Sequence, residues 1–399
     1  MVARRRHRTT ITRMWYPAAR RRRAHLVSFV LTAAVFMAAC GGGDDDSAST
    51  DPDPTDPPAS ATTAATDAPG TTEAAPETTA ADTTVPATTA SESTVPPAED
   101  LPTLTFTPQS AGPLSVTASQ CVVEGIPDGV PDAAVESFAL NATHAFVPVA
   151  GGVAALAFTP GVDCSMVLDP AIGDGGVLTT ADEVSSVAAA ATGRVAATGL
   201  FGGYVFDVPL GQSYACDHAS GYVDLSADGS TLMTSFPGSP VEQFALTDTG
   251  CGPATEIALP AEIVDRYFVA FDGSDLFVGG QFDDDTVYGG RASGGVLQWA
   301  VGNAEVGGPG WIGWVHGLVP CNGGYCLLDT NTDKLVVLDA AGTLRAEFTV
   351  SELIGSRMFY QTLEAGPDGA VYLLATDSAP DGAGDDAEGN YVVRIEVTG

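Results

Sequence analysis

Residues 366–376 read GPDGAVYLLAT, a turn rich in Gly and Asp followed at once by an apolar run that includes Val and Tyr. Such a run between turn residues is typical of a buried β-strand. Five turn glycines, spaced 36, 44, 50 and 46 residues apart, precede runs of this kind: Gly193, Gly229, Gly273, Gly323 and Gly369. Because turn residues are frequent and helical periodicity is scarce across residues 101–399, we predict an all-β fold.

A second apolar strand follows each of these turn-strand pairs, at residues 204–208, 241–246, 296–301, 335–339 and 391–397. The predicted unit is a glycine turn, an inner strand, a variable loop and an outer strand. A period of roughly 45 residues with this density of strands resembles a β-propeller blade. Counting these five units and a weaker copy of the turn and strand at residues 141–147 gives six blades, or seven if residues 104–106 and 135–140 form another. A pair of β-sandwiches is the alternative fold.

Residues 1–39 have the pattern of an export signal. Nine arginines lie before residue 24, and residues 26–39 (LVSFVLTAAVFMAA) form an uncharged stretch of 14 residues. This stretch is shorter than the roughly 20 residues that a membrane-spanning helix needs. It ends in Met37-Ala38-Ala39-Cys40 and is followed by a Gly/Asp run. The pattern resembles the lipobox of bacterial lipoproteins, although Met37 stands where that family usually has Leu. The resemblance implies cleavage before Cys40 and a lipid on its thiol.

Residues 40–100 are predicted to form a disordered tether. After Cys40 they are almost wholly Thr, Ala, Pro, Ser, Asp, Glu and Gly, without a single Phe, Tyr, Trp, Leu, Ile, Lys or Arg. Such a segment cannot bury enough apolar surface to offset its chain entropy. We therefore expect a stalk that carries a folded domain, residues 101–399, away from the membrane.

The charge excludes one class of partner. The chain has 16 basic and 50 acidic residues, a formal net charge of −34. Removing the predicted signal would leave 7 basic residues against all 50 acidic ones, close to −43. Nucleic-acid binding requires a basic surface, so we expect no nucleic-acid partner.

The cysteines fit an exported domain. Besides Cys40 there are six, an even number, as expected where disulfides persist. Fifteen pairings are possible, and pairing between neighbours in the sequence is the simplest: Cys121 with Cys164, Cys216 with Cys251, and Cys321 with Cys326.

No common catalytic motif, such as G-x-S-x-G or HExxH, is present, so the sequence names no nucleophile. One acidic loop has the spacing of a calcium site, with oxygen donors at Asp377, Asp381, Asp385 and Glu388 around Gly382. Ala379 breaks that pattern. A solvated acidic turn is the alternative interpretation, and residues 283–285, three aspartates, form a second acidic candidate.

Aromatic residues provide the other candidate site. All three tryptophans after the signal lie within 16 residues, and Trp311, Trp314 and His316 are predicted to share one face of a strand. Tryptophan faces in Gly-rich loops can stack on sugars, whereas packing between blades is the competing interpretation.

Together these features predict a lipid-anchored protein on the extracytoplasmic face of the cell membrane. Its β-propeller is expected to bind a protein or a polysaccharide of the cell envelope. The alternative function is an extracytoplasmic hydrolase or lyase that uses acidic loops and Ca²⁺. A structural component of the envelope is a third interpretation.

Overall fold

The structure is a computed structural model that describes residues 104–126, 137–216, 218–236, 239–282, 286–356, 359–376 and 390–399. These residues belong to one compact unit, Thr89–Gly399. The predicted signal, the tether and Cys40 lie outside the described residues and stay predictions.

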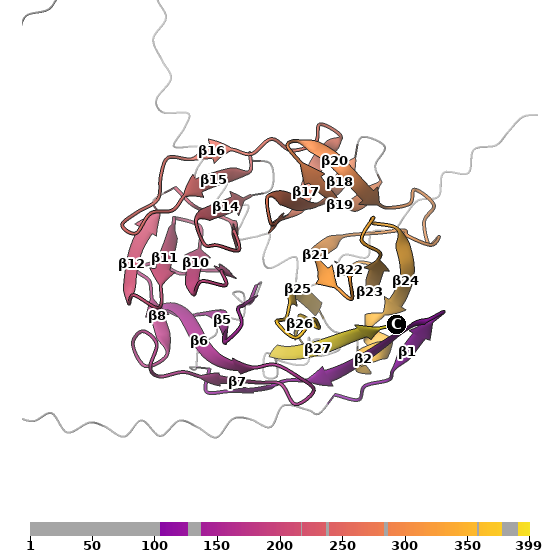
Figure 1. Cartoon of the computed structure of the whole chain (residues 1–399), viewed down its shortest axis with the longest axis horizontal. Coiled ribbons are helices and arrows are strands. Elements are labelled where there is room, and N and C mark those ends of the chain that lie inside the picture. Colours follow the sequence, from indigo (N-terminus) through magenta and orange to yellow (C-terminus); the bar gives the residue numbers. More distant parts are fainter. Residues whose placement is uncertain are drawn as a thin grey trace, which may run out of the picture. The chain divides into compact units, whose positions relative to one another are not determined.

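In the described residues, six sheets that are antiparallel except for one pair of strands surround a central axis and form a six-bladed β-propeller (Figure 1). Four blades are simple up-and-down sheets, in which chain order runs from the axis outward. Blade 2 contains β9 (Ser186–Ala189), β10 (Arg194–Thr198), β11 (Gly203–Asp207) and β12 (Gln212–Cys216). Blade 3 contains β13 (Tyr222–Leu225), β14 (Thr231–Ser235), β15 (Glu242–Ala245) and β16 (Thr255–Glu256). Blade 4 contains β17 (Ile263–Asp272), β18 (Asp275–Phe282), β19 (Val287–Ser293) and β20 (Val296–Val301). Blade 5 contains β21 (Val315–Cys321), β22 (Gly324–Asp329), β23 (Lys334–Leu338) and β24 (Leu344–Thr349).

The remaining two blades close the ring. Blade 6 joins three C-terminal strands, β25 (Phe359–Ala365), β26 (Val371–Thr376) and β27 (Asn390–Thr398), to two N-terminal strands, β2 (Leu114–Gln120) and β1 (Gln109–Ala111). Blade 1 contains β4 (Ala139–Leu140), β5 (His144–Val149), β6 (Gly152–Thr159), β7 (Ser165–Leu168) and β3 (Val122–Glu124), with β8 (Val177–Thr179) paired to β6. The N-terminal segment thus contributes to both blades, with β2 antiparallel to β27 and β3 parallel to β7. A short helix, α2 (Val350–Ile354), follows blade 5.

The predicted propeller is confirmed, and the blade number is six. The segment considered for a seventh blade is divided between other places. Leu104 and Phe106 pack on the core between blades 5 and 6, while Ala139 and Leu140 form β4, the innermost strand of blade 1.

The prediction of which strand is innermost was wrong. The turn glycines join the first strand of a blade to the second, as Gly369 does between β25 and β26. All five have φ between 65° and 87°, a left-handed conformation that favours glycine. The strands predicted as inner are therefore second from the axis. The first strands escaped notice because they mix polar or small residues with apolar ones, as in SVAA of β9 and YVDL of β13.

The core lies between the blades. Each blade packs against one neighbouring blade on either face, so its central strands are buried on both sides. This explains continuous apolar runs such as residues 371–374, in which every residue is at most 2 % exposed. Tyr372 of blade 6 meets Phe158 of blade 1 edge to face, with 5.2 Å between ring centroids. The apolar runs from which the strands were predicted thus supply the side chains that pack adjacent blades together.

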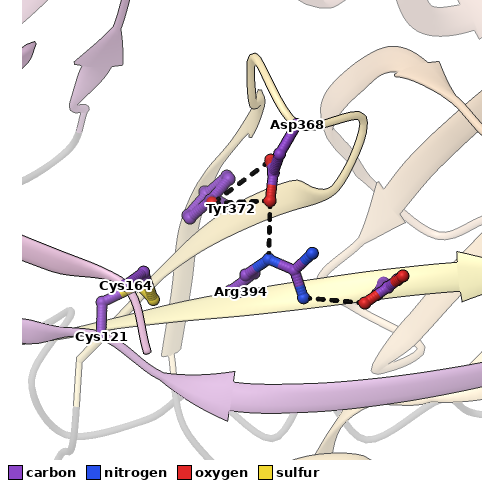
Figure 2. Close-up of a disulfide and its surroundings, with 6 residues drawn as sticks. Cys121, Cys164, Asp368, Tyr372 and Arg394 are labelled. Atoms are coloured by element: carbon purple, nitrogen blue, oxygen red, sulfur yellow. Dashed lines mark hydrogen bonds and ion pairs between the residues drawn. A yellow bond between two sulfur atoms is a disulfide. The ribbon is translucent and has the colours of Figure 1, made fainter. Parts of the chain in front are cut away.

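The three disulfides join cysteines that are neighbours in the sequence. Cys121–Cys164 ties the segment between β2 and β3 to the start of β7, beside the first residues of β27 (Figure 2). Cys216–Cys251 links the outer strand of blade 2 to blade 3, and Cys321–Cys326 closes the β21–β22 hairpin. Three disulfides suggest an extracytoplasmic setting. No helix in the described part of the chain is long and apolar enough to cross a membrane.

Candidate functional site

A cavity of about 430 Å³ lies on the propeller axis, where the innermost strands of all six blades meet. β4, β9, β13, β17, β21 and β25 each contribute residues to its wall. A volume of this size lies within the range of small-molecule sites, roughly 300–1,000 Å³.

The repeat places one wall residue at a fixed distance from each turn glycine. The residue five positions before each turn glycine lines the cavity. In blades 2 to 6 these residues are Ala188, Asp224, Phe268, Leu318 and Glu364. Three blades thus put an apolar side chain at this position, whereas blades 3 and 6 put a carboxyl group there. Neither acid was predicted as a site residue. The departure from an otherwise apolar repeat position is the signal that could have identified them.

Asp224 is held by the backbone of two adjacent blades. One carboxylate oxygen, Oδ2, accepts the N–H of Phe271 on β17 at 2.6 Å, and Oδ1 accepts the N–H of Leu225 at 2.8 Å. Burial raises the pKa of Asp224 to about 6, and the two backbone hydrogen bonds counteract part of that rise. Asp224 therefore joins blade 3 to blade 4 and also presents a carboxyl group to the cavity.

Glu364 is placed differently. It is a partly buried residue of β25 and lines the wall of the cavity. Burial raises the pKa of Glu364 well above its ordinary value, and the charge of Asp224 raises it further. Among the described residues, no N–H or O–H group donates a hydrogen bond to Glu364. Burial and the charge of Asp224 thus both favour retention of a proton on Glu364.

Aromatic rings border the same cavity. Tyr267 and Trp314 stack with 3.9 Å between ring centroids and 11° between ring planes. Trp314 is 36 % exposed, and the ring of His316 is edge-on to it, with 6.1 Å between the ring centroids. Tyr222 and Phe236, which are about half exposed, border an adjoining small pocket together with Tyr267. The cavity therefore opens beside a group of accessible aromatic surfaces.

A network of hydrogen bonds fixes the position of Trp314. The carboxylate of the fully buried Asp329 accepts the N–H of Gly313 at 2.8 Å and that of Trp314 at 2.9 Å. The phenolic O–H of Tyr267 donates to Gln281 Oε1 at 3.1 Å, which orients the second ring of the stack. Both rings are thus held before any ligand arrives, which reduces the entropy that binding must cost.

Two of the three predicted aromatic-site residues come together here, and one does not. Trp314 and His316 line the cavity, whereas Trp311 is outside its wall. The prediction that the three share one strand face was wrong, because β21 begins only at Val315. Trp311 instead belongs to a turn, where its N–H donates to the carbonyl of Gly308 at 3.1 Å.

Trp299, the remaining tryptophan of the predicted aromatic segment, is a partly buried residue of β20 that packs against blade 5. A Cβ at Gly342 would come within 2.2 Å of its ring, and its centroid lies 5.1 Å from that of Tyr325. For Trp299 the interpretation of packing between blades therefore applies.

The acidic calcium candidates, Asp377, Asp381, Asp385 and Glu388, lie outside the described residues, as does the acidic run 283–285. Within the described ranges, no group of three or more His, Cys, Asp or Glu side chains is arranged to hold a metal ion. The predicted Ca²⁺ site therefore stays a prediction.

Comparison with known proteins does not name a ligand. No protein-family model matches the chain, and no curated protein is significantly similar to it.

Proposed function

We propose that this protein is a lipid-anchored envelope protein whose propeller binds a polysaccharide at the axial cavity. The observation that carries the proposal is the Tyr267–Trp314 stack at the wall of the cavity, with Trp314 partly exposed. Large, flat, amphipathic rings of this kind match the apolar faces of sugar rings. A propeller fold fits a binding role, but a fold alone does not select a ligand, so the argument rests on the site.

The anchor and the setting come from the sequence. Lipidation of Cys40 would hold the protein at the extracytoplasmic face of the membrane, and residues 41–100 would let the propeller reach envelope material. The disulfides support an oxidising compartment. Metabolic labelling with palmitate tests the anchor: the wild type should be labelled, and Cys40→Ala should not.

The binding proposal is tested with one tryptophan substitution and a matched control. Calorimetry of the full-length protein against soluble glycan fragments should give binding that Trp314→Ala abolishes. Trp311→Ala removes the same side chain from a turn outside the cavity wall and should bind normally. Neither tryptophan is fully buried, and Trp314 is 36 % exposed, so both variants should remain folded.

Equal loss of binding in the two variants, or unfolding of Trp314→Ala, would contradict the assignment of Trp314 to the site. Circular dichroism melts of both variants separate these outcomes.

Hydrolysis of the glycan is the second candidate function. Asp224, Glu364 and His316 line one cavity. Cleavage of sugars uses two carboxyl groups, of which one is an acid with a raised pKa, and burial raises the pKa of Glu364 more than that of Asp224. Release of new reducing ends from the bound glycan, lost in Glu364→Gln, would establish this activity. Binding without such release would leave the protein a binder.

A further inference from the structure

The axial cavity has an excess of acidic groups. The titratable and charged side chains on its wall come from four of the six innermost strands: Tyr222 and Asp224 on β13, Asp265, Arg266 and Tyr267 on β17, His316 on β21, and Glu364 on β25. β4 and β9 contribute only small or apolar residues and Ser186. Three carboxyl groups thus face one guanidinium group.

Glu364 is the least compensated of these groups. It lines the cavity, is partly buried, accepts no hydrogen bond within the described part of the chain, and has the like-charged Asp224 as an electrostatic neighbour. Withdrawing a charge from water without a partner costs free energy, so such a carboxyl favours either a proton or a cation beside it. Because Glu364 borders the cavity, a ligand bound there could supply that cation.

A primary ammonium group fits these surroundings. It has three donors and no acceptor, so it can hydrogen-bond to Glu364, and its positive charge offsets the charge of Asp224 on the wall of the same cavity. The aromatic rings of Tyr267 and Trp314, on the wall of the same cavity, favour a cation near their faces. An acetylated nitrogen would bring neither the charge nor the donors.

We propose that the cavity recognises a glycan with free amino groups, with the ammonium of a hexosamine unit bound between Glu364 and Asp224 and the sugar ring against Trp314. This inference rests on the proposed function, since it names the class of glycan that would occupy the same site. The raised pKa values of both acids support it, because an incoming ammonium favours their ionised forms and binding should therefore release protons.

Calorimetry on the full-length protein tests the inference with two matched ligands, a glucosamine oligomer and the N-acetylated oligomer of the same length. At pH 6, where the amino groups of the oligomer carry protons, the free amine should bind about tenfold tighter or more, the size expected for hydrogen bonds to a charged group. Repeating the titration in buffers of different ionisation enthalpy should reveal proton release for the amine alone.

Glu364→Gln keeps the size of the side chain and removes its charge, so it should abolish the preference for the amine over the acetylated oligomer. Glu352→Gln removes the same charge from an exposed position on α2 and should change neither affinity. A thermal melt of each variant confirms that it is folded.

The outcomes separate the two proposals. Binding of both oligomers with equal affinity, unchanged in Glu364→Gln, would overturn the amine inference and leave glycan binding intact. No binding of either oligomer, or of any other glycan, would overturn the proposed function and the inference with it. Displacement of the amine by Ca²⁺ in the wild type, lost in Glu364→Gln, would instead assign the cavity to a metal ion and overturn the inference.

Discussion

Blade 6 contains two acidic residues only four positions apart that have opposite surroundings. At the β25–β26 turn, Asp368 accepts from Arg394 Nε at 2.8 Å and lies 3.3 Å from the hydroxyl of Tyr372 (Figure 2). On the cavity wall, Glu364 has no such donor among the described residues and has Asp224 as a repulsive neighbour. A charge that is withdrawn from water persists only when it is compensated. Asp368 is therefore a carboxylate that holds the ring together, whereas Glu364 is available to a ligand.

The closing region of the ring is cross-linked as well as paired. Cys121–Cys164 lies beside the Arg394 cluster and spans 43 positions of sequence between the N-terminal strands and blade 1. Arg394 is 7 % exposed and also pairs with Glu396 at 2.9 Å. The charged groups around Arg394 therefore help to hold the ring closed, whereas Glu364 in the axial cavity takes no part in closing the ring.

The largest predicted effect comes from removing that cross-link. Replacing Cys121 and Cys164 together by Ser should lower the free energy of unfolding by about 4 kcal/mol, because the disulfide limits a long loop in the unfolded chain. The same replacement of Cys321 and Cys326, only 5 positions apart, should cost about 2 kcal/mol. Urea unfolding of the two double variants measures both values, and an equal loss would contradict a special role for the closing region.

The next largest effect concerns the paired carboxylate. Asp368→Asn leaves Arg394 buried with Glu396 as its remaining ionic partner, so it should destabilise the protein by about 2 kcal/mol. Asp248→Asn provides the control, because Asp248 is 85 % exposed in its side chain and lies 3.7 Å from Arg194. Chemical unfolding should leave this control within about 0.5 kcal/mol of the wild type. A stable Asp368→Asn variant would show that the Arg394 cluster does not hold the ring closed.

The smallest predicted change is a gain in stability instead of a loss, and it comes from replacing Glu364. The pKa of Glu364 is raised in the folded state, so the folded protein retains a proton that the unfolded chain releases as the pH rises. Stability should therefore fall as the pH rises above about 4, the ordinary glutamate range, towards the raised pKa. Asp224, with a pKa of about 6, adds a loss in the same direction below that pH.

Glu364→Gln cannot ionise and should melt at a higher temperature than the wild type at pH 8, with little difference at pH 4. Melts across that pH range measure the gap. A variant that is less stable than the wild type at pH 8 would mean that Glu364 has a structural partner, and the contrast with Asp368 would not hold.

The sequence predicted the propeller because buried strands leave long apolar runs, as in residues 371–374, and because turn glycines repeat at the spacing of blades. It did not reveal the first strand of each blade, since those strands face the axis and tolerate Asp224 or Glu364 among apolar residues. Trp314 and His316 were found because tryptophan clusters are visible in a sequence. The partners of the site come from different blades, and only the closed ring brings them together.

The central claim is that the axial cavity is the ligand site and that its carboxyl pair receives an amine. A crystal structure of the protein with a glucosamine oligomer tests this most directly. The account predicts a sugar ring against Trp314, with its amino nitrogen within hydrogen-bonding distance of Glu364. A glycan bound elsewhere on the propeller, or one whose amino group points away from both Glu364 and Asp224, would contradict it.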